Sequence, residues 1–150
     1  MRVAKLALLV TLISGVLVAC DSNPVDEEHG HEAVEGLSLT MGGVEIVVVE
    51  AGVVTGQISV ESGQETPDIF VEWRDPDGEH FHEDDLEDHL TLGHLITGVT
   101  DIAEFEHHSD DPRFSFHIHG ENVGTTTIEL QLFNNDHIDF RTPSIPIVVN

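Results

Sequence analysis

Cysteine and the familiar catalytic motifs are scarce in this sequence. Its 150 residues include a single cysteine, Cys20, so the chain forms no internal disulfide. If Cys20 is modified, no thiol is left for a nucleophile, a cysteine-ligated zinc site or a blue-copper centre. The sequence also lacks a Gly-x-Ser-x-Gly elbow, a phosphate-binding loop, a dinucleotide fingerprint and a His-Glu-x-x-His helix. These absences predict that the protein is not an enzyme.

Positive charge is scarce as well. Five Lys and Arg residues stand against 29 Asp and Glu residues, which gives a formal net charge of -24. Arg2 and Lys5 precede Cys20, so the chain from residue 20 onward has three arginines, no lysine and a formal net charge of -26. So acidic a surface repels nucleic acid and anionic lipid headgroups, and it attracts cations. Solubility in a salty medium explains the carboxylates equally well, and the two explanations can hold together.

Long apolar runs are limited to the N-terminus. Two basic residues precede the apolar run Leu6–Val18, and the small residue Ala19 follows it, which is the pattern of a secretory signal. The run is shorter than the roughly 20 apolar residues that cross a bilayer, so a spanning helix is not expected. Leu17-Val18-Ala19-Cys20 resembles the lipobox of bacterial lipoproteins. The resemblance implies a signal peptide over residues 1–19 and a lipid, such as palmitate, on Cys20. That lipid would anchor the protein to a bacterial membrane, and the sequence leaves open which one.

Residues 20–36 are polar, acidic and without periodicity, which is typical of a flexible tether. The tether contains His29 and His31 between glutamates. This cluster resembles the histidine- and acid-rich flexible segments of bacterial zinc-uptake proteins. A charged spacer with no metal role is the alternative.

Residues 37–150 consist of short Val, Ile, Thr and Phe runs broken by Gly, Pro and Asp-rich turns, a pattern typical of β-structure. We expect an all-β, antiparallel sandwich of about seven to nine short strands. Residues 124–132 and 144–149 resemble the closing strands of bacterial immunoglobulin-like domains. One short helical segment is expected at Glu83–Leu90. The expected strands lie at Leu37–Met41, Val44–Glu50, Val53–Val60, Asp68–Arg74, within Leu92–Glu106 (one or two), and at Arg113–His119, Thr125–Phe133, Ile138–Arg141 and Ile145–Val149.

Histidine is unusually abundant. Eleven are present, and six of them form three His-x-His pairs, often beside carboxylates. Imidazole is the commonest protein ligand for zinc and other late transition metals, so the clustering predicts a metal site. The first-choice ligands are His80, His82, His117 and His119. Supplementary ligands are Glu83, His107 and His108, with His29 and His31 in the tether.

The strand expected around His117 shows how two of these ligands share a face. Strict alternation sends Phe116 and Ile118 to one side, and His117 and His119 to the other, about 6.6 Å apart along the strand. The strand that follows repeats the alternation, which predicts that Glu129 lies near the same face. The alternative is a pair of solvent-facing polar residues on a half-exposed sheet.

Two functions follow from these patterns. The first is an envelope-anchored lipoprotein that binds a divalent transition metal, most simply zinc, as a carrier or buffer, with a metal-transport protein as a partner. The second is an acidic structural or interaction module of the cell envelope with no dedicated metal site. Neither function involves nucleic acid.

Overall fold

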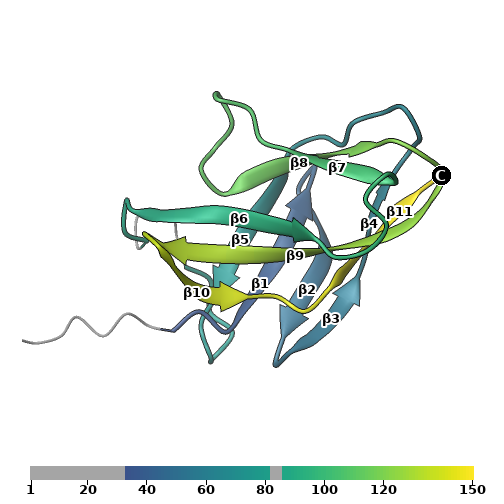
Figure 1. Ribbon diagram of the computed structural model, residues 1–150. Helices are drawn as coiled ribbons and strands as arrows, with labels where there is room; N and C mark the ends of the chain where they lie inside the picture. Colours follow the sequence, from purple (N-terminus) through teal and green to yellow (C-terminus); the bar gives the residue numbers. More distant parts are fainter. Residues whose placement is uncertain (1–32, 82–85) are drawn as a thin grey trace, which may run out of the picture. The chain divides into compact units, whose positions relative to one another are not determined.

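The computed structural model describes residues 33–81 and 86–150, and these residues form eleven strands in two sheets (Figure 1). The all-β sandwich prediction is confirmed. Among the described residues there is no helix with the length and apolarity that a membrane crossing requires. Several predicted residues lie outside the described residues: the signal segment 1–19, Cys20, His29, His31, His82 and Glu83.

The first sheet has six strands, and every neighbouring pair in it is antiparallel. Its members are β1 (Gly36–Met41), β2 (Val44–Glu50), β3 (Val53–Gly56), β5 (Ile69–Arg74), β7 (Ala103–Glu106) and β8 (Ser115–Gly120). Their order across the sheet is β3-β2-β1-β5-β8-β7. In this sheet the hairpin of β7 and β8 neighbours β5 through β8, and the backbone of β8 also bonds to the connection that leads into β5.

The second sheet has five strands built around one long strand. Its members are β4 (Ile58–Val60), β6 (Leu90–Ile96), β9 (Gly124–Asn134), β10 (His137–Arg141) and β11 (Ile145–Val149). Strand β6 pairs along one edge of β9, while β10 and β11 share the other edge. Strand β4 pairs with β11 in parallel, so the antiparallel prediction holds for every strand pair except this one.

Alternating apolar side chains from both sheets form the core. Phe116 and Ile118 of β8, and Ile128 and Leu130 of β9, are fully buried. Burying each such side chain contributes roughly 1.5–3 kcal/mol relative to leaving it exposed, before the cost in conformational entropy. Trp73 is also buried, and its ring meets other aromatic rings of the core edge to face. The intervening residues of β8 consequently face outward, which places His117 and His119 on the outer surface of the first sheet.

The strand predictions hold in position, with two of them divided. The expected strand Val53–Val60 is β3 followed by β4, because the chain leaves the first sheet at Gly56 and enters the second at Ile58. Gly56 has φ +94°, and a Cβ there would lie 2.1 Å from the Ile46 carbonyl oxygen, so only glycine fits this crossing. The stretch Leu92–Glu106 contains most of β6 and all of β7, so two strands lie where one or two are expected, and the two divisions together give eleven strands.

The expected helix over Glu83–Leu90 is wrong for the part that the structure describes. Residues 86–89 form bends and turns, and Leu90 is the first residue of β6, paired with Asn134. Leu86 and Leu90 are both buried in the core. Four-residue spacing of two leucines favours a helix in sequence, but here the second leucine is held by the sheet ladder.

Candidate metal centre

Three segments of the chain bring histidines and carboxylates together on the outer surface of the first sheet. They are the connection from β4 to β5, the connection from β7 to β8, and β8 itself. The side chains that meet are those of Glu65, Asp68, His108, Asp111 and His117, which we call the His117 cluster. Two triplets within it, Glu65/His108/His117 and Asp68/Asp111/His117, have their ligand atoms within 4.8 Å of one another.

The local sequence explains why His117 and Asp111 are held in place. His117 lies between two fully buried core residues of β8, so its side chain faces outward and is 13% exposed. Asp111 is 11% exposed and accepts a hydrogen bond from the backbone N–H of His108, at 2.5 Å. The Asp111 N–H in turn donates to the His108 carbonyl, so this connection closes on itself as a tight turn. The turn keeps the Asp111 carboxylate beside β8.

The two nitrogens of the His117 ring have different partners. Nδ1 lies 2.9 Å from the backbone carbonyl oxygen of Thr66. A carbonyl oxygen only accepts, so Nδ1 carries the hydrogen of this bond. Nε2 lies 3.0 Å from Asp68 Oδ1 and 3.5 Å from Asp111 Oδ2. Nε2 can therefore either donate a proton to these carboxylates or offer its lone pair to a metal ion that they share.

His108 and Glu65 form the second half of the cluster. His108 Nε2 lies 3.1 Å from Glu65 Oε1, and the centroids of the His108 and His117 rings are 5.1 Å apart. The same Glu65 oxygen is 3.3 Å from Nδ1 of His117. Because Nδ1 is already bonded to the Thr66 carbonyl, a metal ion on this side would compete with that bond. The Asp68/Asp111/His117 triplet is therefore the better arranged of the two to bind a metal ion.

The electrostatics of the cluster favour cations. Partial burial lowers the pKa of His117, but the hydrogen bond to the Thr66 carbonyl and the three nearby carboxylates raise it more, so the net pKa lies above its ordinary value. The hydrogen bond with Glu65 raises the pKa of His108. The backbone N–H of His108 lowers the pKa of the Asp111 carboxyl. The cluster thus holds ionised carboxylates around imidazoles that take up either a proton or a divalent cation.

Of the other predicted ligands in the described residues, His119 and His80 lie apart from both triplets, whereas His107 lies beside Asp111, with Nδ1 3.9 Å from Oδ2. His119 is on the same strand and face as His117, but its Nε2 lies 3.9 Å from Oε1 of Glu121, outside the cluster. His80 bridges to Arg74 of β5 and lies 3.4 Å from Glu72. His107 hydrogen-bonds through Nδ1 to a backbone carbonyl of β8 at 2.9 Å. Of the described predicted ligands, the structure brings His117 and His108 together.

The carboxylates of the cluster were not among the predicted ligands. The expectation that Glu129 lies near His117 is wrong, because β9 belongs to the second sheet and Glu129 lies 3.6 Å from Arg141 there. The carboxylates beside His117 come instead from Asp68, directly before β5, and from the turn at Asp111. Only the pairing of β5 with β8 identifies Asp68 as a neighbour of His117, and this pairing cannot be predicted from the sequence of either strand alone.

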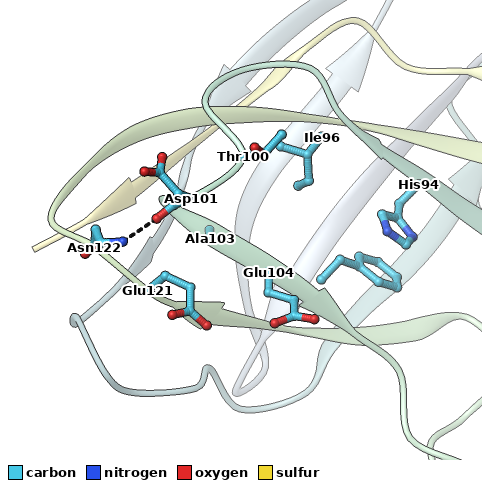
Figure 2. A pocket seen from close by; sticks show the side chains of 9 residues that line it. His94, Ile96, Thr100, Asp101, Ala103, Glu104, Glu121 and Asn122 are labelled. Atoms are coloured by element: carbon cyan, nitrogen blue, oxygen red, sulfur yellow. Dashed lines mark hydrogen bonds between the residues drawn. The ribbon is translucent and has the colours of Figure 1, made fainter.

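A separate cleft of about 500 Å³ lies beside the edge strands β6 and β7 (Figure 2). His94 of β6 stacks on Phe105 of β7, with ring centroids 3.8 Å apart and planes 12° apart. At the other end, Asn122 donates a hydrogen bond to the Asp101 carbonyl at 2.6 Å. Partial burial lowers the pKa of His94, so its neutral form is favoured. The cleft wall at His94 is therefore aromatic and uncharged near neutral pH.

Comparison with known proteins gives little beyond the fold. The sequence matches no protein-family model and no curated protein. Two solved structures of the S-layer protein SbsC are similar to this chain. The crystal structure of domains 4 and 5 has a TM-score of 0.43 at 19% identity, covering 71% of this chain and 56% of that one. The structure of domains 5–6 has a TM-score of 0.44 at 19% identity, covering 69% and 45%. The chain thus spans about half the length of the S-layer chains it matches, and similarity at this level transfers no property.

Proposed function

We propose that this protein is an acidic structural or interaction module of the bacterial cell envelope, held to a membrane by a lipid on Cys20. The signal-like N-terminus and the lipobox resemblance support the anchor. The formal net charge of -26 from residue 20 onward supports a surface that stays soluble and repels anionic polymers. The β-sandwich supplies a rigid body with a closed apolar core.

The observation that carries this proposal is the spread of the histidines. A carrier built from a histidine-rich sequence predicts that many imidazoles converge on one site. In residues 33–81 and 86–150, no group of three ligand side chains contains more than two histidines. Other imidazoles lie beside carboxylates of their own, such as His80 with Glu72 and His89 with Glu87. Such isolated surface pairs contribute little stability and hold metal weakly, so they support a solvated acidic surface.

Membrane fractionation of cells producing Cys20→Ser tests the anchor. A hydroxyl is a far weaker nucleophile than a thiolate, so lipid attachment should be lost and the protein should move to the soluble fraction. The wild-type chain produced at the same level is the control. A Cys20→Ser protein that stays as firmly in the membrane fraction as wild type contradicts the lipid anchor.

A metal carrier or buffer is the second candidate, and the pairing of His108 with His117 among three carboxylates favours it. The two candidates differ in the number of ions they bind. A structural module should hold at most one zinc ion tightly per chain, whereas a buffer should hold several. Metal analysis of the full chain after dialysis against zinc distinguishes them, because two or more retained ions per chain support the buffer.

A further inference from the structure

The junction between β5 and β8 is the shortest in the first sheet. Strands β1 and β5 pair through six residues each, but β5 and β8 pair at only two positions, Ile69 with Phe116 and Phe70 with Ser115. The backbone of β8 also pairs with the connection from β4 to β5, where Glu65 bridges to His119 and the Thr66 N–H donates to the Ile118 carbonyl. Between these two stretches of pairing, the chain before Ile69 leaves a gap in the ladder.

The His117 cluster lies at one end of this short junction. In an antiparallel pair the register runs in opposite directions, so the position beyond Ile69 and Phe116 pairs Asp68 with His117. Directly opposed side chains lie on the same face of a sheet and are close enough to interact. Asp111 approaches the same point from the connection between β7 and β8. Three chain segments therefore meet at the gap between the pairing of β8 with β5 and its pairing with Thr66.

The spacing of the three side chains suits a tetrahedral ion. Zinc bonds of about 2.0–2.2 Å to nitrogen and oxygen place neighbouring ligand atoms about 3.3–3.5 Å apart. Nε2 of His117 is 3.0 Å from Asp68 Oδ1 and 3.5 Å from Asp111 Oδ2, and all three ligand atoms lie within 4.8 Å of one another. Small movements of the Asp68 side chain, which is 45% exposed, would complete the fit.

The surroundings of His117 also match those of a metal ligand. Ligating histidines commonly donate their other ring N–H to a backbone carbonyl, which fixes the ring and leaves a lone pair on the ligating nitrogen. The bond from Nδ1 to the Thr66 carbonyl does this here. The two carboxylates also balance the two positive charges of a divalent ion.

We propose that Asp68, Asp111 and His117 bind one divalent transition-metal ion, with zinc as the best-fitting ion and water completing its coordination. The ion fastens the β7–β8 hairpin to the residue before β5 by bridging a gap in the backbone pairing of β8. This site has a different ligand set from a carrier built on histidines, and its role is to stabilise the fold. It goes beyond the proposed envelope function, which stands whether or not the metal binds.

Amide hydrogen exchange on the full chain, purified in detergent without a histidine tag and stripped with a chelator, tests the proposal. The probes are the amides of Thr66 and Val71, which donate across the junction to the Ile118 and Phe114 carbonyls. Adding zinc chloride should slow their exchange at least tenfold and raise the melting temperature by about 5–10 °C when zinc is in roughly hundredfold excess over its dissociation constant. Calcium should do neither, because imidazole is a poor ligand for a hard cation.

Matched variants decide whether the three named side chains are responsible. His117→Asn and Asp68→Asn should each remove the zinc-dependent protection. His119→Asn, on the same strand and face but outside both triplets, should retain it. Asp68 is the more exposed of the two ligands, so Asp68→Asn tests the site even where His117→Asn fails to fold. Zinc binding weaker than millimolar, equal protection in Asp68→Asn and wild type, or an equal effect of calcium would each overturn the proposal.

Discussion

His117 of β8 is mostly buried and His94 of β6 is exposed, and their pKa values move in opposite directions. Around His117, three carboxylates and a backbone carbonyl overcome partial burial and raise the pKa. At His94, desolvation lowers it, and within residues 33–81 and 86–150 no ion pair with a carboxylate compensates. The same residue type is thus prepared for a cation in one region and kept neutral in the other. The charged and polar groups around the imidazole decide whether the effect of burial on its pKa is overcome.

The largest expected effect comes from Phe116, which supports both regions. Its ring is fully buried and stacks on Phe105 at 5.0 Å, and Phe105 in turn stacks on His94. Phe116 also precedes His117 on β8. Phe116→Ala should therefore destabilise the fold by about 3–5 kcal/mol in urea unfolding and weaken both histidine environments together.

Phe116→Leu is the matched control for that change, because it keeps much of the apolar volume but removes the aromatic ring. Its loss of unfolding free energy should be clearly smaller than that of Phe116→Ala. Losses that are equal in the two variants would show that ring stacking, and not the filled volume, holds the two regions together. A loss below about 1 kcal/mol for Phe116→Ala would contradict the central position given to this side chain.

Salt should have a smaller effect on stability, and it should change the pKa of His117 more than that of His94. Raising the ionic strength from about 0.01 M to 0.1 M shortens the Debye length from about 30 Å to 10 Å, which screens the repulsion between the many surface carboxylates. The melting temperature of the chelator-treated protein should therefore rise with monovalent salt. In NMR titrations, the pKa of His117 should fall toward its ordinary value as its carboxylate partners are screened, while that of His94 should change little, because burial is not screened. A melting temperature that does not respond over this range would contradict charge repulsion as a main destabilising effect.

Much of the fold could be predicted from the sequence because each strand carries its own signal. The β8 segment alternates apolar and polar residues, and the structure buries Phe116 and Ile118 while His117 faces outward, as expected. The turn residues near Gly42 and Asn135 separate strands at the expected places, and both residues have positive φ. Local patterns of this kind depend only on neighbours in the chain. The likeness to immunoglobulin-like domains and the lipobox stay predictions.

The candidate site could be predicted only in part, because it depends on which strands are neighbours. The alternation identified His117 as an outward-facing ligand but could not show that β8 pairs with β5 rather than with β9. That single pairing replaces Glu129 with Asp68 as the carboxylate beside His117. His80 bridges to Arg74 and lies beside Glu72, outside both triplets. Spacing along one strand predicts which side chains share a face, whereas the topology decides what they face.

The smallest expected effect concerns His94 and its pH dependence. A pKa lowered in the folded state means that the unfolded chain, with an ordinary pKa of about 6.5, binds the proton first as the pH falls. The contribution of neutral His94 to stability is therefore complete above about pH 6.5 and is lost as the pH falls through its lowered folded value.

Many carboxylates also titrate in acid, so the useful quantity is the difference between wild type and His94→Gln. Urea unfolding at about pH 7.5 and pH 5 should show a smaller loss of stability in His94→Gln than in wild type. His137→Gln, at an exposed position of β10, controls for the loss of a histidine and should behave as wild type. If His94→Gln instead loses more stability on acidification than wild type, His94 gains a proton more readily in the fold than outside it, and the contrast with His117 disappears.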